Sequence, residues 1–448
     1  MGSSLIDFTP HYAQAGAQPF TDRRATMPWR PTVPIPPEQV QAQWQSLLSQ
    51  AAPARKRLLY LHVPFCATHC KFCAFYQNRY KPESCVQYTQ YLLREIDMES
   101  GSPLHQSAPI HAVYFGGGTP SALAAKDLFR IIQTLRARLP LAPDCEITIE
   151  GRVLDFDDER IDACLDAGAN RFSIGIQTFN SRIRKQMGRT SDGPQARRFI
   201  EGLSKRDRAA IVCDLLFGLP GQNEENWAED LTIAQGIGLD GVDLYALNLL
   251  PGTPLAKAVE NKRVTIPTPL ERRDLYLQGC QMLDDAGWRH ISNSHWACTT
   301  RERNLYNLLI KRGADCLAMG AGGGGSVNGR TYMVERQLSK YYQAIEQQQK
   351  PLMMMMHSTA DHQWRHTLQA GVEIGRIPLP EITPHAQQLA PLINQWHQAG
   401  LTKDAGTCIR LTDEGRFWAS NLLQSLQQLI LQLNSESPTS LPQRSTLL

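Results

Sequence analysis

The stretch LLYLHVPFCATHCKFC, residues 58–73, contains the two features that decide the fold. It opens with Leu58–Val63, an apolar run whose length and composition indicate a buried β-strand. A loop follows directly and places Cys66, Cys70 and Cys73 in the spacing C-x3-C-x2-C. The sequence therefore predicts three thiols that converge where a strand ends.

Three clustered cysteines predict a metal or iron-sulfur site. Thiolates bind soft metals, and a four-iron cluster held by three protein sulfurs keeps one iron open for another ligand. A structural zinc ion is the alternative, but a closed zinc site needs four ligands, and the nearest candidates, His62 and His69, lie in the same crowded loop. We therefore predict a 4Fe-4S cluster on these three cysteines.

Apolar runs alternate with helical patterns downstream of this loop. Such alternation is the signature of repeated βα units around a parallel sheet, and six units predict an α/β fold, a partial (β/α)6 barrel. The predicted strands are Leu58–Val63, His111–Phe115, Cys145–Glu150, Arg171–Gln177, Ile211–Phe217 and Gly241–Leu247, and the predicted helices include Val86–Glu99, Ala122–Leu139, Glu224–Ile237 and Pro269–Ala286.

The segments around this repeat set the expected domain organisation. A Pro-, Gln- and Ala-rich start predicts an arm, and a mainly helical C-terminal region with a short strand at Ile409–Thr412 predicts a winged-helix-like domain. The expected divisions are an N-terminal arm (1–57), the barrel (58–290), a connecting segment that covers the barrel mouth (291–357), the C-terminal helical domain (358–434) and a disordered tail (435–448).

Composition excludes several classes of partner. Among 448 residues, 46 Lys and Arg against 43 Asp and Glu give a formal charge of +3, which is too small to favour nucleic acid. No secretory signal pattern opens the chain and no apolar run is long enough to cross a bilayer, so we expect no membrane insertion. Most of the 11 cysteines are scattered singly, and we expect a cytoplasmic protein with reduced thiols.

Polar and glycine residues follow several predicted strands, at the strand ends where βα barrels build their sites. The turn GGGTP, Gly116–Pro120, lets a ligand approach the backbone, although an ordinary glycine turn would look the same. Glu150 and Gln177 end two strands, where a helix cap is the alternative role for Glu150. Asp214 lies in an otherwise apolar strand, and because an unpaired buried carboxylate is costly we expect it to have a ligand or partner.

The cysteine spacing, with an aromatic residue before the third cysteine, resembles the radical S-adenosylmethionine (SAM) superfamily. In that family SAM chelates the open iron, and an electron from the reduced cluster cleaves its sulfonium bond to give a deoxyadenosyl radical. The resemblance implies a 4Fe-4S cluster and SAM as cofactors. It assigns SAM contacts to Tyr60, Phe72, Gly117, Gly118, Thr119, Glu150, Gln177, Arg189 and Asp214.

The resemblance is stronger to the branch that contains oxygen-independent coproporphyrinogen III dehydrogenase and the related heme chaperones, which share the turn FGLP, Phe217–Pro220. A tetrapyrrole substrate is therefore implied. In the dehydrogenase another cysteine follows the third after one residue, where this chain has Phe75. In the chaperones the cluster motif begins near the N-terminus, whereas residues 1–65 precede it here.

Other segments resemble the anaerobic heme-utilisation proteins of the HutW and ChuW type, the anaerobilin synthases: EGR at Glu150–Arg152, HWACTTRERNLYN at His295–Asn307, and Gly320–Gly322. That resemblance implies a radical SAM methyltransferase that opens the heme macrocycle without oxygen, with one SAM as radical source and another as methyl donor. Iron is released and a methylated linear tetrapyrrole, anaerobilin, is formed. The dehydrogenase and a non-catalytic heme chaperone remain the alternatives.

This resemblance also implies partners: heme as substrate, reduced flavodoxin or another low-potential electron donor, and an acceptor of the tetrapyrrole product. For heme we expect a wall of His295, Arg301, Arg303 and Tyr306, with His295 or Tyr306 as axial ligand, although single residues of these types more often form ordinary hydrogen bonds. No catalytic side chain is assigned. The run Met353–Met356 is expected to pack in a core or form an apolar lid.

Overall fold

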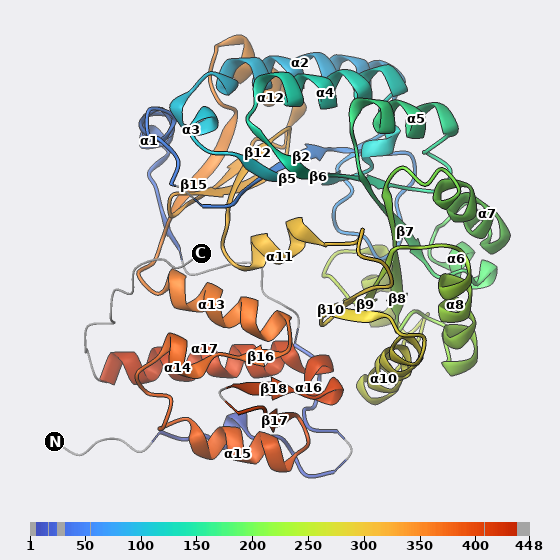
Figure 1. The fold of residues 1–448 in the computed structure, drawn as a ribbon, viewed down its shortest axis with the longest axis vertical. Helices are drawn as coiled ribbons and strands as arrows, with labels where there is room; N and C mark the ends of the chain where they lie inside the picture. The colour runs from blue at the N-terminus through green and yellow to red at the C-terminus, as the bar shows by residue number, and fades with distance from the viewer. Residues whose placement is uncertain (1–5, 17, 25–31, 54, 407, 437–448) are drawn as a thin grey trace.

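A computed structural model of the chain describes residues 6–16, 18–24, 32–53, 55–406 and 408–436. Its main feature is a curved sheet of 13 strands (Figure 1). Seven neighbouring strands run parallel, in the order β12 (Asp315–Met319), β2 (Arg57–Val63), β5 (Ile110–Gly117), β6 (Leu141–Gly151), β7 (Arg171–Gln177), β8 (Ala210–Phe217) and β9 (Gly241–Ala246).

Antiparallel strands extend this parallel region at both edges. Beyond β9 lie β11 (His295–Ala297) and β10 (Arg289–Ser292), and beyond β12 lie β13 (Gly324–Val327), β14 (Arg330–Val334), β15 (Leu352–Ser358) and β1 (Thr32–Pro34). A short parallel pair, β3 (Phe65–Cys66) and β4 (Asn78–Arg79), frames the cysteine loop.

Helices cover the outer side of the curved sheet (Figure 1). They are α2 (Pro82–Ser100), α4 (Ala125–Arg138), α5 (Asp158–Ala167), α7 (Gly193–Ser204), α8 (Glu224–Gly236) and α10 (Pro269–Asp285). Shorter elements complete this part: η1 (Thr9–His11), α1 (Pro37–Leu48), α3 (Pro103–Gln106), η2 (Pro120–Ala122), α6 (Ser181–Gln186), α9 (Pro254–Glu260), α11 (Leu305–Lys311) and α12 (Leu338–Glu346). None of the helices in the described part of the chain is long and apolar enough to cross a membrane.

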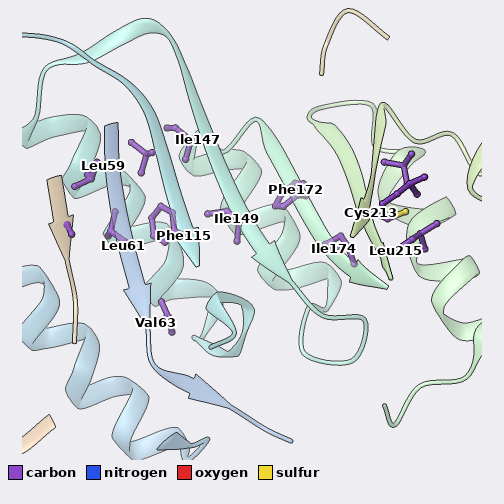
Figure 2. Close-up of a cluster of buried hydrophobic side chains, with 14 of the residues drawn as sticks. Leu59, Leu61, Val63, Phe115, Ile147, Ile149, Phe172, Ile174, Cys213 and Leu215 are labelled. Carbon is purple, nitrogen blue, oxygen red and sulfur yellow. The ribbon is translucent and has the colours of Figure 1, made fainter. Parts of the chain in front are cut away.

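The two faces of the parallel strands differ because successive side chains point to opposite sides. The outward set packs against the helices as the main core, and Figure 2 shows Leu59, Leu61, Val63, Phe115, Ile147, Ile149, Phe172, Ile174, Cys213 and Leu215. The inward positions between them are polar, among them Tyr60, Tyr114, Glu150, Ser173 and Asp214. The interior of the open barrel is therefore lined with groups able to bind or react.

The C-terminal residues form a separate layer next to the open side of the barrel (Figure 1). It comprises α13 (His362–Glu373), β16 (Arg376–Ile377), α14 (Leu379–Ile382), α15 (Ala390–Gln398), β17 (Thr402–Asp404), β18 (Ile409–Leu411), α16 (Asp413–Phe417) and α17 (Ala419–Glu436). The small sheet β16-β18-β17 among these helices agrees with the winged-helix-like prediction.

The six predicted strands and four predicted helices of the barrel are confirmed, although β6 begins four residues earlier than predicted, at Leu141. Residues 291–357, expected to be a connecting segment, form strands β11 to β15, which extend the same sheet. In these five strands only Val327, Thr331 and Val334 are β-branched, so the Gly-rich and Met-rich sequences indicate a strand only weakly. The predicted tail, residues 435–448, lies outside the described residues from 437 onward, and so do parts of the predicted arm, residues 1–5, 17, 25–31 and 54.

Candidate active site

A cavity of about 160 Å³ lies at the carboxyl ends of the parallel strands. All three clustered cysteines line it, together with residues of β6, β7 and β8 and of the turn after β5. Its lining includes Cys66, Cys70, Cys73, Phe72, Gly118, Thr119, Glu150, Ser173, Arg189 and Asp214. The structure thus brings the cysteines together with most of the residues predicted to contact SAM.

The cysteine loop is fixed by contacts from distant parts of the chain. Arg152 donates to the carbonyl oxygen of Thr68 (3.1 Å) and to its hydroxyl (2.7 Å). The amide of Lys71 donates to the carbonyl of Met187 at 3.1 Å, which ties the loop to the end of α6. Because β6 and α6 hold the loop from two sides, the three thiols face the cavity in a preorganised loop.

Two glycines let the turn after β5 pass close to this loop. The amide of Gly118 donates to Val63 at 2.8 Å, and an added Cβ would lie 2.6 Å from the carbonyl oxygen of Phe65. Gly117 has a φ of +107°, and a Cβ there would lie 2.5 Å from the ring of His62. No larger residue fits at either position, so the glycines serve close backbone approach.

Two buried polar atoms at the cavities have no hydrogen-bond partner among the described residues. They are Nε of Arg189 and Oε1 of Gln177. Gln177 also has a φ of +66°, a conformation that residues other than glycine rarely adopt and that is concentrated at functional sites. Buried polar groups without partners are costly, which indicates that a ligand completes these bonds.

Two carboxylic acids share the same region. Glu150 accepts a hydrogen bond from Tyr114 (2.7 Å), and Asp214 accepts one from Ser173 (3.2 Å). Burial raises the pKa of Glu150. Burial, together with the neighbouring carboxylates of Asp243 and Glu150, raises the pKa of Asp214 to about 7. A cationic or hydroxyl-bearing ligand between the two acids would relieve this electrostatic cost.

The donor set fits an iron-sulfur cluster. Burial raises the pKa of the Cys66 and Cys73 thiols, and the guanidinium groups of Arg152 and Arg189 oppose this effect. Among the described residues no three Cys, His, Asp or Glu side chains are close enough to hold one metal ion. A cluster does not require such closeness, because each cysteine binds a different iron.

A second cavity, of about 400 Å³, lies between the barrel mouth and the C-terminal domain. It shares Phe72, Cys73 and Asp214 with the smaller cavity, so the two are adjacent. Side chains of α13, α16 and α17 form its far wall, and most of its surface is apolar. Gln177 lines this larger cavity, whereas Tyr60 and Gly117 line neither.

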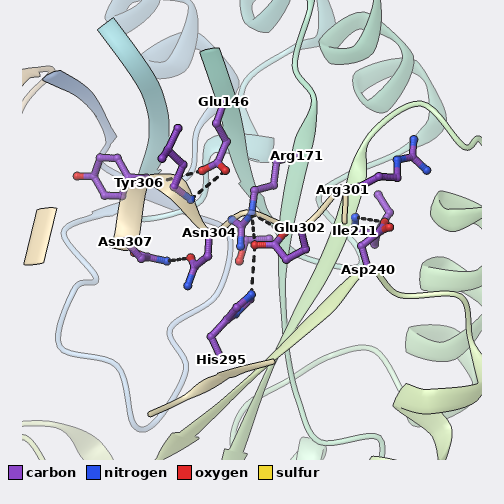
Figure 3. A network of polar contacts seen from close by, with 12 residues as sticks. Glu146, Arg171, Ile211, Asp240, His295, Arg301, Glu302, Asn304, Tyr306 and Asn307 are labelled. Carbon is purple, nitrogen blue, oxygen red and sulfur yellow. Dashed lines mark hydrogen bonds and ion pairs between the residues drawn. The ribbon is translucent and has the colours of Figure 1, made fainter. Parts of the chain in front are cut away.

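The residues predicted to form a heme wall lie elsewhere, near the amino ends of the strands (Figure 3). His295 is fully buried, with Nδ1 3.0 Å from Asp243 and Nε2 3.2 Å from Glu302. Burial alone would lower its pKa, but the two carboxylates raise the pKa to about 9. Each ring nitrogen is therefore within ion-pair distance of a buried carboxylate, which leaves neither of them to bind an iron.

The other three predicted heme residues also have protein partners. Arg301 pairs with Asp207 (2.5 Å) and Arg303 with Asp144 (3.1 Å), both on the exterior. Tyr306, on α11, stacks on Tyr114 with ring centroids 4.6 Å apart, and its hydroxyl lies 3.7 Å from the sulfur of Cys316. The structure does not bring these residues to either cavity.

Sequence reasoning missed several residues that shape the cavities. Ser173 and Tyr245 face inward at strand positions that alternate with core residues, so the period of two could have identified them. Arg152 was noted only as part of a motif, although it holds the cysteine loop. Arg23 lines the larger cavity from the N-terminal arm, and no local pattern marks it.

Known proteins resemble this chain at three levels. Residues 60–233 match the model of the radical SAM superfamily. The chain is 68% identical to anaerobilin synthase of Escherichia coli O157:H7, over 97% of this chain and 98% of that protein. It is 29% identical to the heme chaperone HemW of Synechocystis sp., over 64% of this chain and 70% of the relative.

A solved structure has the same fold. Coproporphyrinogen III oxidase (HemN) from Escherichia coli, a radical SAM enzyme, superimposes with a TM-score of 0.73 at 22% identity, over 92% of this chain and 97% of the other.

Proposed function

The chain belongs to the anaerobilin synthase family within the radical SAM superfamily, and on that premise we propose that it is a radical SAM methyltransferase that opens the heme macrocycle without oxygen. The observation that carries the proposal is the identity of 68% along almost the whole of both chains. The products are released iron and a methylated linear tetrapyrrole. The adjacency of the cysteine cavity and the larger cavity supports a reaction between two bound molecules.

In this proposal Cys66, Cys70 and Cys73 hold a 4Fe-4S cluster in the smaller cavity. When bound there, the cluster and SAM supply a radical and a methyl group. Glu150 and Asp214 accept hydrogen bonds from SAM, and Arg189 completes its unpaired bond on it. Gln177 reaches SAM from the wall of the adjoining larger cavity. Phe72, Gly118 and Thr119 line this cavity, and Tyr60 and Gly117 support its wall from behind.

The larger cavity is proposed to hold heme. Its mostly apolar wall excludes water from the edge of the heme that reacts. Phe72 and Asp214 line both cavities and therefore lie where heme and SAM meet. A cavity of about 400 Å³ falls within the range typical of small-molecule sites. Heme contacts by His295, Arg301, Arg303 or Tyr306 form no part of this proposal, because their side chains are engaged elsewhere.

The reaction also needs partners outside the chain. We infer reduced flavodoxin or another low-potential protein as electron donor, and an acceptor that removes the tetrapyrrole product. The described cysteines are free thiols, which supports a cytoplasmic location, where thiols stay reduced.

The proposal is tested by incubating the cluster-loaded protein with heme, SAM and a low-potential reductant under strict anaerobiosis. The expected result is loss of the Soret band with accumulation of both deoxyadenosine and S-adenosylhomocysteine. Decarboxylation of coproporphyrinogen would instead favour the dehydrogenase. Heme that is bound and returned intact to an acceptor would favour the chaperone.

A further inference from the structure

Three cationic side chains line the larger cavity, and two of them have an acidic or amide partner. Lys311 forms an ion pair with Glu373. Arg416 donates from Nη1 to the side-chain oxygen of Asn293 at 3.0 Å. The third is Arg23, and among the described residues no carboxylate lies within 4.0 Å of its guanidinium.

Arg23 reaches the cavity from a segment far away in sequence, and its backbone is clamped on both sides. The backbone amide of Arg24 donates to the side-chain oxygen of Asn421 (3.0 Å), and the side-chain amide of Asn421 donates to the carbonyl of Asp22 (3.0 Å). Ser420 donates to the carbonyl of Arg24 at 2.5 Å. The arm is thus fixed to the first turn of α17, immediately before and after Arg23.

The side chain of Arg23 is itself oriented. Its Nε donates to the carbonyl of Phe417 at 2.8 Å, and its guanidinium carbon lies 5.5 Å from the centre of the Phe417 ring. Only one of its five N–H donors has a recorded acceptor among the described residues. The group is therefore held in place with most of its bonding capacity unused.

Such a group is electrostatically incomplete. Burial lowers the pKa of Arg23, and the more distant carboxylates of Glu373 and Asp22 offset this effect only in part. A carboxylate in the cavity would restore that stability, and a planar guanidinium matches a carboxylate through two parallel hydrogen bonds. Heme carries two propionates beside a flat apolar ring, which is the combination of groups that this wall would accept.

We propose that Arg23 binds a carboxylate of the tetrapyrrole in the larger cavity. This inference rests on the proposed function and assigns one specific contact within it. It gives the N-terminal arm a role in substrate recognition, because the anchored segment Asp22–Arg24 places the Arg23 side chain at the cavity.

The test measures binding of hemin and of hemin dimethyl ester, in which both propionates are blocked, by Soret titration without SAM or reductant. In wild-type protein hemin should bind at least about tenfold more tightly than the diester, since hydrogen bonds to a charged group contribute more than neutral ones. Arg23→Gln should remove this preference by weakening hemin alone.

Arg24→Gln is the matched control. It removes the same charge from the same arm, but the Arg24 side chain is exposed and only its backbone anchors the segment. It should leave both affinities unchanged. Cluster EPR and circular dichroism establish that each variant is folded and loaded.

Equal binding of hemin and diester by the wild type overturns the inference, and so does equal weakening of both by Arg23→Gln. Unchanged hemin binding in Arg23→Gln overturns it as well. Failure of wild-type protein to convert bound hemin overturns the proposed function without affecting the binding result, so the two failures are distinguishable.

Discussion

Both ends of the barrel hold buried polar groups. Those at one end form ion pairs with each other, and those at the other end do not. At the amino ends of the strands, Arg171, Glu302 and His295 form a buried chain in which every member contacts an opposite charge (Figure 3). At the carboxyl ends, Nε of Arg189 and Oε1 of Gln177 are buried without a hydrogen-bond partner among the described residues, Arg189 beside the smaller cavity and Gln177 beside the larger one. Arginine therefore stabilises the fold at the amino ends, the closed end of the barrel, and awaits a ligand at the carboxyl ends, the open end.

The difference shows how a buried charge should be judged. A histidine or arginine that is held in buried ion pairs with the protein stabilises structure, whereas one with no ion pair and an unpartnered atom beside a cavity indicates binding. His295 was predicted as a heme residue on its chemical type, but both of its nitrogens face carboxylates.

Replacing any one of the cluster cysteines should abolish function at the open end. Cys66→Ala, Cys70→Ala or Cys73→Ala is expected to eliminate the cluster EPR signal and SAM cleavage, because two thiolates hold a four-iron cluster poorly. Cys298→Ala is the control, since Cys298 is exposed and lies outside both cavities. A full, redox-active cluster in all three variants would contradict the assignment.

Breaking the closed network should reduce stability rather than catalysis. Glu302→Gln leaves Arg171 and His295 without their shared carboxylate, and removing one partner of a buried ion pair costs about 3–5 kcal/mol. Denaturant unfolding measures this loss. Glu381→Gln, in an exposed pair with Arg376, should cost less than about 1 kcal/mol. Equal losses would mean that the closed end is not a stabilising centre.

Replacing Arg189 should affect SAM binding and cleavage rather than stability. Arg189→Ala is expected to weaken SAM binding or slow its cleavage by roughly 10- to 100-fold, with iron content and unfolding free energy close to wild type. Arg301→Ala removes an arginine that pairs on the exterior, and SAM cleavage should be unchanged. Normal SAM affinity and turnover in Arg189→Ala would return this residue to a structural role.

The closed end should also respond to pH. The pKa of His295 is raised to about 9, above its usual value near 6.5. Its stabilising contribution is therefore complete below about pH 6.5 and is lost as the pH rises through about 9, a change on the order of 2–3 kcal/mol. Unfolding of the wild type between pH 7 and 9.5 should show this loss, and His295→Gln should reduce it. An identical slope in both proteins would refute the charged state of His295.

The sequence predicted the open end better than the closed end for a physical reason. The cluster cysteines lie within eight residues, and Glu150 and Gln177 end strands that an apolar pattern reveals, so local information suffices. The partners of His295 come from β9 and from the segment after β11, and no pattern specifies that pairing.

The strands of the sheet edge and the role of the arm were hidden for related reasons. The strands β13 to β15 are rich in glycine, which is disfavoured in strands, and in methionine, which does not indicate a strand. Pairing with neighbouring strands stabilises them. Arg23 meets Phe417 across nearly the entire chain, a contact that only the folded structure reveals.

The central claim is that the radical chemistry of the cysteine cavity transfers a methyl-derived carbon to heme in the adjoining cavity. It is tested most directly with SAM labelled with carbon-13 at the methyl group, incubated anaerobically with heme, reductant and the cluster-loaded protein. We predict that mass spectrometry will find a linear tetrapyrrole that carries the labelled carbon. Intact, unlabelled heme recovered while SAM is consumed would contradict the claim.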